Sequence, residues 1–340
     1  MAKKIIKRGL FILLLAVLVA SPFYPLPYYI SKPGTAQELE PIIEVENGSA
    51  GKGSFMLTTV RMGQANIYTF LAGKIHKYYD VLPERSVRRS GESREEYAVR
   101  QLHLMDSSKI SAIETAFKKA GLPVNYKYKG VYILSVMDNM PAEGKLKPGD
   151  RIFQVDDYKF RSADEFIKYV EKKEAGDEIV LKFERMGKYR ETAIVLDYFP
   201  KENRAGVGIG LVDDKEIDSE PSVKVNTEDI GGPSAGFMFA LEIYNQLIDE
   251  DLTRGYDIAG TGTISPDGKV GPIGGIEQKV VAAHKAGADI FFAPHDEGED
   301  ESNYEAAVKT AKDIGTNMKI VPVTHFDDAV RYLQSLKEKE

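Results

Sequence analysis

The chain presents a serine in a turn of small residues, Gly231-Gly232-Pro233-Ser234-Ala235-Gly236, directly before an apolar segment that is typical of a helix. Further along, a lysine lies inside a second apolar segment, Gly274-Gly275-Ile276-Glu277-Gln278-Lys279. A serine hydroxyl is a poor nucleophile until a base removes its proton, and burial makes a lysine such a base because it lowers the lysine pKa. If the two side chains meet in the fold, the pair predicts a serine–lysine hydrolase.

The residues around Ser234 are suited to a catalytic turn. Gly232 permits close approach of the backbone, and Pro233 fits the first turn of a helix, where no amide hydrogen is needed. Free amides and the positive end of the helix near Ser234 are suited to an oxyanion, which acyl transfer requires. Taken alone, the serine is more typical of a helix N-cap. The apolar neighbours of Lys279 predict a partly desolvated amine; they are Ile276, Val280, Val281 and Ala283.

Three motifs, in this order, resemble the proteolytic domain of Lon proteases. They are 232–236 (GPSAG), 259–264 (AGTGTI) and 272–287 (PIGGIEQKVVAAHKAG), and the likeness continues to 291–294 (FFAP). The resemblance implies that Ser234 is the nucleophile and Lys279 the general base, and that Thr261 helps to orient the lysine. Two positions depart from the Lon pattern, Gly231 where aspartate is usual and Thr263 where glutamate is usual. The sequence leaves open whether Asp229 compensates.

Strand-like and helix-like segments alternate from residue 205 onward, which predicts an α/β (α+β) fold for the Lon-type proteolytic domain. The expected helices are 233–248, 276–286, 303–313 and 327–336; the expected strands are 207–212, 223–225, 258–264, 269–270, 290–294 and 319–323. Residues 51–58 resemble the early strands of the same domain. This likeness implies that a further module is inserted into a discontinuous protease domain.

The N-terminal part of the chain is less regular. Residues 31–42 are expected to form a linker, and 42–60 two strands joined as a hairpin by a glycine-rich turn. Residues 67–82 have a mixed, partly helical pattern, and the charge-rich 83–108 is expected to be a solvated helical region. An amphipathic helix is predicted for 108–120, ended by the glycine that follows it.

Residues 124–198 resemble a PDZ domain, a mainly-β module. The resemblance rests on a strand-like 130–136, a helix at 163–173, strands at 178–184 and 192–196, and the turn 146–152 (LKPGDRI). PDZ domains bind extended peptides by adding a strand to the edge of their sheet. The resemblance implies a peptide groove between the strand at 131–136 and the helix that starts near Ala163. A noncatalytic surface module is the alternative interpretation.

The first thirty residues predict a transmembrane anchor. The basic residues Lys3, Lys4, Lys7 and Arg8 precede an apolar run that, counted from Leu10 to Ile30, is long enough to cross a bilayer. The basic flank is expected to stay cytoplasmic, which places the rest of the chain outside the cell. A cleaved signal peptide is the main alternative, because small residues end at Ser21, but the proline that follows disfavours cleavage. A buried helix is a second alternative.

The composition agrees with two soluble domains and an anchor. The chain has 340 residues, of which 43% are hydrophobic and 29% charged, as in folded proteins. Its net charge of −7 does not predict nucleic-acid binding, which needs a basic face. Cysteine is absent, which excludes disulfides, thiolate metal sites and a cysteine nucleophile. The five scattered histidines lack metal-ligand spacing, so neither a metal nor a cofactor is expected.

The layout of anchor, PDZ domain and Lon-like domain resembles the YlbL/SepM-like membrane proteases of Gram-positive bacteria. The expected organisation is an anchor at 1–31, a mixed region at 32–123, a PDZ domain at 124–198 and a Lon-like domain at 201–338. No G-x-x-x-x-G-K-[ST] motif occurs, so the protease is expected to act without ATP.

The resemblance implies a membrane-anchored serine endopeptidase whose catalytic domain faces the cell exterior. Its expected substrates are short, extended or unfolded chains near the membrane, such as precursors of peptide signals or small division inhibitors made under stress. A PDZ-bound peptide segment is a further expected partner, and a homo-oligomeric ring is compatible with the family. Two alternatives remain open, a catalytically inactive PDZ-containing membrane scaffold and an amidase acting on a small molecule.

Overall fold

The computed structural model describes residues 21–89, 91–199, 204–227, 230–295 and 302–339, together with positions 9, 11, 15 and 19. The chain divides into two compact units, each built from separate stretches. Unit 1 comprises Met1–Pro41, Ser49–Ser90 and Ser234–Glu340, and unit 2 comprises Ile42–Gly48 and Gly91–Pro233. The first unit is therefore discontinuous in sequence, with most of the second unit inserted between its parts.

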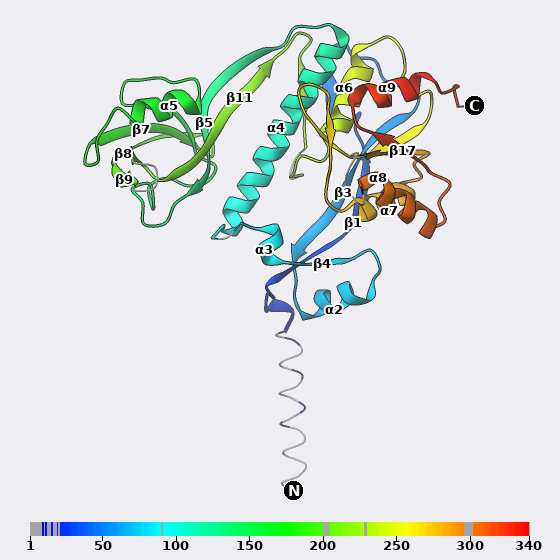
Figure 1. The fold of residues 1–340 in the computed structure, drawn as a ribbon, viewed down its shortest axis with the longest axis horizontal. Helices are drawn as coiled ribbons and strands as arrows, with labels where there is room; N and C mark the ends of the chain where they lie inside the picture. The colour runs from blue at the N-terminus through cyan, green and yellow to red at the C-terminus, as the bar shows by residue number, and fades with distance from the viewer. Residues whose placement is uncertain are drawn as a thin grey trace. The chain divides into compact units, whose positions relative to one another are not determined.

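Unit 1 is built on a six-stranded mixed sheet with the order β17-β16-β13-β3-β1-β4 (Figure 1). Its strands are β1 (Tyr28–Glu38), β3 (Ser54–Gln64), β4 (Asp80–Pro83), β13 (Asp257–Gly260), β16 (Ile290–Pro294) and β17 (Lys319–Val323). The strands from β17 to β3 are parallel to their neighbours, and β1 runs antiparallel to both β3 and β4. The parallel part is the half of the sheet that carries the predicted site of Ser234, Thr261 and Lys279.

Two pairs of helices cover this sheet. The helices are α6 (Gly236–Leu247), α7 (Ile276–Ala286), α8 (Asn303–Asp313) and α9 (Phe326–Gln334). On β16, Phe291 packs in a core with α7 and α8, whereas the neighbouring Phe292 contacts ring side chains of α6 and α9. Successive side chains of a strand point to opposite faces, so the two helix pairs lie on opposite faces of the sheet. Unit 1 is thus a three-layer α/β/α arrangement.

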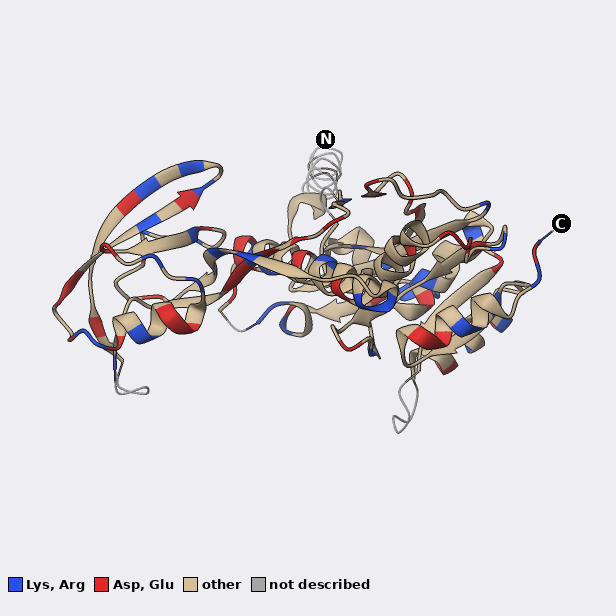
Figure 2. Ribbon diagram, turned by 90° about the horizontal axis from the view of Figure 1, so that it is seen from above, with Lys and Arg blue, Asp and Glu red and all other residues tan. Residues whose placement is uncertain are grey.

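Unit 2 contains a five-stranded antiparallel sheet with the order β11-β5-β6-β7-β8. Its strands are β5 (Asn125–Val136), β6 (Arg151–Val155), β7 (Glu178–Arg185), β8 (Lys188–Val195) and β11 (Ile209–Asp218), and α5 (Ala163–Val170) packs against their core. The unit also contains α4 (Arg94–Ala120) and the short ribbon of β2 (Ile43–Val45) with β12 (Val223–Val225). Acidic and basic residues are interspersed along the ribbon of each unit (Figure 2).

The remaining elements are short. Unit 1 adds η1 (Ser21–Phe23), α2 (Ile67–Ile75), α3 (Glu84–Val87) and the ribbon of β14 (Thr263–Ile264) with β15 (Val270–Gly271). Unit 2 adds the ribbon of β9 (Asp197–Phe199) with β10 (Arg204–Gly206).

Most elements predicted for the C-terminal part are confirmed, but the predicted strand 258–264 is divided into β13 and β14, and the predicted strand 207–212 is β11, which extends to Asp218. The predicted helix 276–286 is α7, and Gly287 ends it in the left-handed region at a φ of 83°. The predicted helix 303–313 is α8, and the predicted strands 290–294 and 319–323 are β16 and β17. The predicted helix 327–336 is α9, which begins one residue earlier and ends at Gln334.

The prediction of an anchor up to Ile30 followed by a linker over 31–42 is wrong at this boundary. Residues 1–20 lie outside the described residues except for the four isolated positions, but β1 already begins at Tyr28. Tyr29 and Ile30 are buried in the sheet, and burial in a protein core selects the same apolar residues as a membrane does. Within the described part of the chain, no helix has the length and apolarity needed to span a bilayer.

The predicted hairpin over 42–60 is also wrong. Its first strand, β2, pairs with β12, far away in the sequence, while its second strand, β3, pairs with β1 and β13. Gly53 is required here for close approach rather than for a hairpin, because a Cβ on it would lie 2.2 Å from the Tyr256 carbonyl oxygen. Local turn signals do not reveal such distant partners.

The helical region predicted at 83–108 and the helix predicted at 108–120 are not separate helices at their shared boundary. A single helix, α4, begins after Ser93, whose side chain accepts a hydrogen bond from the Glu96 amide, while the Glu96 carboxylate accepts one from the Ser93 amide. These two reciprocal hydrogen bonds form a capping box, which starts the helix at a polar stretch inside the region predicted as 83–108. The mixed pattern of 67–82 resolves into α2 followed by β4, so only its first half is helical.

Candidate active site

The three predicted site residues come from three elements of unit 1. Ser234 lies just before α6, Thr261 directly follows β13, and Lys279 is in the first turn of α7. Parallel strands of a sheet end at one edge, where loops and helix starts converge. The fold therefore brings together residues that are distant in the sequence.

The structure places these side chains in direct contact. Nζ of Lys279 lies 2.7 Å from Oγ of Ser234 and 2.8 Å from Oγ1 of Thr261. Oγ1 of Thr261 in turn donates to the Ser234 carbonyl oxygen at 3.0 Å. The Gly262 amide donates to the same carbonyl at 2.9 Å, so the serine turn is held to the end of β13 by two hydrogen bonds.

This arrangement fixes how the amine is oriented. A threonine hydroxyl has one proton, and Thr261 uses it on the Ser234 carbonyl, so it meets the lysine as an acceptor. A neutral amine has two N–H groups and one lone pair. With one N–H directed at Thr261, the lone pair is free to accept the proton of the Ser234 hydroxyl.

Burial sets the protonation state of the lysine. The Lys279 side chain is 2% exposed, and this desolvation lowers its pKa from 10.5 to about 7. Among the described residues no carboxylate forms an ion pair with it, so nothing offsets the cost of burying the charge. A substantial fraction of Lys279 is therefore the neutral base at neutral pH.

Backbone amides next to the serine are available for a negative charge. Within the described chain, the amides of Ser234 and Ala235 donate no hydrogen bond, and they precede the N-terminus of α6. Unpaired amides at a helix start are suited to bind an oxyanion. Ser234 itself is half-buried, so its hydroxyl remains accessible to a substrate.

The two glycines that precede Pro233 belong to unit 2. Gly232 has a φ of 91°, in the left-handed region where glycine is favoured, and its amide donates to the Gln101 carbonyl at 2.9 Å. Gly231, where Lon enzymes usually have aspartate, is exposed, and a Cβ on it would lie 2.9 Å from the Gln101 Cβ. Thr263 lies on the β14–β15 ribbon opposite Gly271. Asp229 lies outside the described residues.

Sequence reasoning missed several residues that support the site. Gln278 is buried next to the lysine, and its Nε2 hydrogen-bonds Asp80 on β4. Thr58 on β3 donates from its hydroxyl to the Gly260 carbonyl at 2.9 Å, immediately before Thr261. A polar residue within an apolar run was the available signal in each case, but the sequence does not identify its partner.

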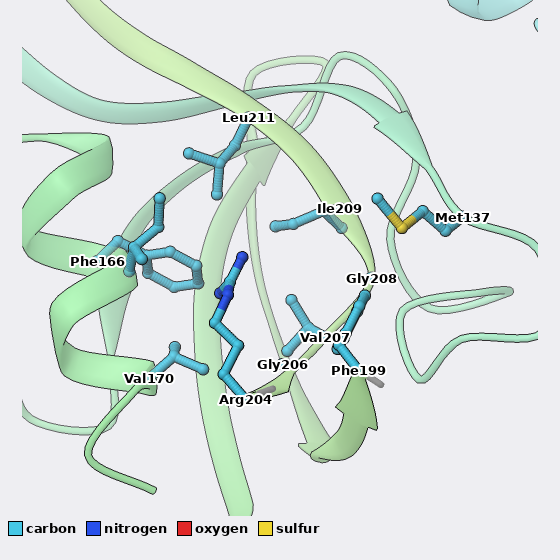
Figure 3. Close-up of a pocket in the computed structure, with 11 residues that line it drawn as sticks. Met137, Phe166, Val170, Phe199, Arg204, Gly206, Val207, Gly208, Ile209 and Leu211 are labelled. Atoms are coloured by element: carbon cyan, nitrogen blue, oxygen red, sulfur yellow. The ribbon is translucent and has the colours of Figure 1, made fainter. Parts of the chain in front are cut away.

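Unit 2 has a pocket of its own, between α5 and the start of β11 (Figure 3). Phe166 and Val170 of α5 face Ile209 and Leu211 of β11, and the Arg204 side chain points into the space between them. The groove predicted beside 131–136 is displaced, because β5 is already paired on both sides, with β11 and β6. Both β11 and β8 are edge strands of this sheet; β11 is the one that lines this pocket, and it lies beyond the predicted module boundary of 198.

Comparison with known families identifies two domains in the chain. Residues 225–335 match the family model of the Lon protease (S16) C-terminal proteolytic domain, and residues 114–196 match that of the PDZ domain. The Lon protease of Metamycoplasma arthritidis is 29% identical over 150 residues, which are 44% of this chain and 17% of that protein. The Lon protease of Campylobacter concisus is 38% identical over 101 residues, 29% of this chain and 12% of that protein.

The chain is also similar in sequence to a solved structure. It is the PDZ domain of the SdrC-like protein from Listeria monocytogenes, 37% identical, which covers 25% of this chain and 90% of that domain, with a TM-score of 0.25. The match of residues 225–335 to the Lon family model shows that the chain contains a serine peptidase domain of the Lon type. With it the chain carries a PDZ domain, and it matches only 12% to 17% of the length of the two Lon proteases above.

Proposed function

We propose that this chain is a membrane-anchored serine endopeptidase that works with a Ser234–Lys279 dyad and without ATP. The observation that carries the proposal is the 2.7 Å contact between Oγ of Ser234 and a buried Lys279 amine that has no carboxylate partner among the described residues. A paired or exposed lysine would remain protonated at neutral pH and would not act as a base.

The proposed reaction follows from the contacts. The Ser234 oxygen attacks the carbonyl carbon of the scissile peptide bond while Lys279 takes the hydroxyl proton. The amides of Ser234 and Ala235 stabilise the oxyanion that forms. Lys279 then gives the proton to the leaving amine, and a water molecule, deprotonated by the same lysine, hydrolyses the acyl-enzyme. Thr261 acts as a positioning residue that directs the lysine lone pair.

A cleavage assay with matched variants tests the dyad. We expect the full chain to cleave casein or a fluorogenic peptide, and Ser234→Ala and Lys279→Ala each to lose activity by at least about 10³-fold. Lys285→Ala, which changes an exposed lysine on the same helix, is the control and should cleave at the wild-type rate. Equal activity of all four proteins would exclude the dyad, and an inactive wild type would favour the scaffold alternative.

The expected substrates follow from the absence of a motor motif. The 340 residues contain no Walker A sequence, which supports cleavage without a nucleotide-driven unfolding step. We infer that it cleaves short, extended or already unfolded chains. Small exported or single-pass proteins close to the membrane have this character, and precursors of peptide signals or small division inhibitors are examples.

The pocket of unit 2 is the proposed site for a peptide segment of the substrate. β11 is an edge strand, so an extended peptide has a row of backbone groups with which to pair. Within the described residues the amides of Val207 and Gly208, at the end of the pocket, donate no hydrogen bond, and they are suited to a terminal carboxylate. Apolar side chains such as Phe166 and Leu211 would accept a terminal apolar residue.

The proposed location rests on the N-terminal sequence. Four basic residues precede the apolar run from Leu10 to Ala20, and such a flank is retained on the cytoplasmic side. The peptidase unit would then lie outside the cell. Protease protection of the full chain in oriented membrane vesicles distinguishes this topology from its reverse, which would expose the peptidase unit on the cytoplasmic face.

A further inference from the structure

Helix α2 of unit 1 exposes a continuous apolar stripe. Ile67, Leu71 and Ile75 recur every four residues and are 46%, 54% and 80% exposed, and Tyr68 beside them is 43% exposed. Residues four apart lie on one face of a helix, so these side chains form one surface. An apolar stripe of this kind on an otherwise polar surface indicates a binding face.

The opposite face of α2 is firmly attached to the sheet. Gly73 is buried so closely that a Cβ on it would lie 2.6 Å from Cγ2 of Val81 on β4. The Phe70 ring packs edge-on against Tyr28 of β1 at 5.0 Å. Asn66 caps the first turn through hydrogen bonds with the Tyr68 and Thr69 amides. The helix is therefore fixed, and its apolar stripe is held outward.

The stripe lies where the apolar N-terminal sequence ends. Oγ of Ser21 hydrogen-bonds the Tyr68 hydroxyl at 3.1 Å, and Nδ2 of Asn66 donates to the Pro22 carbonyl at 3.1 Å. α2 accordingly lies beside the first residues of β1 (Figure 1). Phe23 and Tyr24, which follow the apolar run directly, are 83% and 71% exposed. Aromatic residues in such a position are typical of the membrane–water interface.

The segment from Arg61 to Tyr79, which contains α2, is basic, whereas the whole chain is acidic. Arg61 and Lys74 are basic, Lys77 is basic but forms an ion pair with Asp313, and no aspartate or glutamate occurs from Arg61 to Tyr79, although the chain has a net charge of −7. Lys74 lies at the border of the stripe, one residue before Ile75. An apolar stripe with bordering cations matches the surface of a bilayer that contains anionic lipids.

We propose that α2 lies in the interface of an anionic membrane, with Ile67, Leu71 and Ile75 inserted among the lipids. This proposal rests on the proposed anchor, because the anchor brings α2 to the bilayer. A single spanning segment leaves the peptidase unit free to rotate and tilt. A second contact through α2 holds the sheet, and with it Ser234, in one orientation towards the membrane surface.

The absence of tryptophan from the chain permits a direct test. Full-length Ile75→Trp, reconstituted in vesicles of phosphatidylcholine and phosphatidylglycerol, carries one tryptophan on the stripe. Met186→Trp places the reporter on a 94% exposed side chain of unit 2 and is the matched control. Leu15→Trp places it in the apolar run itself. Lipids brominated at defined depths then report which tryptophans contact the acyl chains.

We expect shallow bromine atoms to quench Ile75→Trp by about two-fold or more, whereas Met186→Trp remains unquenched. The quenching should weaken when phosphatidylglycerol is omitted. Equal emission of Ile75→Trp and Met186→Trp would overturn the inference. A blue shift of Ile75→Trp that depends on protein concentration and not on bromine would show instead that a second copy covers the stripe.

The Leu15→Trp variant separates this inference from the anchor. If deep bromine atoms quench Leu15→Trp but not Ile75→Trp, the anchor holds and the role of α2 is wrong. If neither variant is quenched, both the anchor and the role of α2 are wrong. Peptide cleavage by each variant, measured in the same vesicles, reports on the dyad independently.

Discussion

The burial that lowers the pKa of Lys279 and suits it to act as the proposed base also destabilises the fold. In the unfolded chain a lysine has a pKa near 10.5, and in the fold burial lowers the pKa of Lys279 to about 7. The unfolded state therefore binds a proton more readily between these values, which destabilises the fold as the pH falls from about 10.5 to about 7. The difference corresponds to roughly 5 kcal/mol at its full extent. The site retains the lysine despite this cost because a neutral amine is the proposed base.

Lys279→Met should therefore be inactive and yet gain stability at neutral pH. Methionine is similar in length and has no charge to desolvate. The unfolding free energy of the variant relative to wild type should rise by roughly 3 kcal/mol between pH 10 and pH 7. Denaturant titrations of both proteins at the two pH values measure this change.

Two controls make the stability result specific. Lys285→Met changes an exposed lysine of the same helix and reports any general effect of removing a positive charge. Glu242, whose pKa burial raises to about 7, also titrates in this range, but it is present in both proteins and cancels. A relative stability that does not change with pH would show that Lys279 keeps an ordinary pKa in the fold.

Thr261 provides a test of positioning by a hydroxyl. Thr261→Val keeps the shape of the side chain but removes the acceptor 2.8 Å from the lysine amine and the bond to the Ser234 carbonyl. We expect kcat to fall about 10- to 100-fold with little change in KM. Thr261→Ser, which restores the hydroxyl, should recover most of the rate. A kcat of Thr261→Val equal to that of wild type would remove the positioning role.

At the scale of elements, the sequence predicts a helix or strand correctly where its local signals agree with its long-range contacts. Helix α7 has an apolar face, a glycine at its end and the lysine motif within it, and both of its boundaries were predicted. The same holds for β16, whose five residues are all buried. Proximity of Ser234, Thr261 and Lys279 was predicted only because their motifs resemble a known domain, since spacing alone gives no distance.

The elements that were missed depend on partners far away in the chain. β1 contains Lys32, Pro33 and Gly34, which interrupt a strand pattern, and it is a strand because β3 and β4 flank it. The groove of unit 2 was assigned to β5 because β11 lies past the end of the recognised module. Strand order is a property of tertiary pairing, and no local pattern encodes it.

A substitution at Gly53 tests the close packing of this residue against Tyr256, which the structure shows in place of the predicted hairpin turn. A Cβ at this position would meet backbone atoms of Tyr256, which do not move easily. Gly53→Ala should lower the free energy of unfolding of the chain by about 1–3 kcal/mol. The control is Gly63→Ala, in β3 itself, where no heavy atom lies within 4 Å of the added carbon. This substitution should change the free energy of unfolding by less than about 0.5 kcal/mol. Equal melting temperatures of the two variants would contradict this packing.

At the scale of the whole molecule, we propose that unit 1 cleaves the substrate and that unit 2 binds a peptide segment of it. Met137 lines the pocket of unit 2 and is 43% exposed, whereas Met186 is exposed in the same unit and does not line it. Met137→Asp should raise KM for a long unfolded substrate about ten-fold and leave cleavage of a short peptide unchanged. Met186→Asp should behave as wild type with both substrates. Equal KM values of the two variants for the long substrate would contradict substrate binding in this pocket.

The central claim is that a neutral Lys279 activates Ser234, and the pH dependence of covalent labelling tests it most directly. A fluorophosphonate probe should modify the full chain once, on Ser234, at a rate that rises with pH through a single ionisation near pH 7. Lys279→Met should react at least about 10³-fold more slowly over the same range. Mass spectrometry of the digested protein identifies the labelled residue. Labelling of Lys279→Met at the wild-type rate, or a midpoint near 10.5 in the wild type, would contradict the claim.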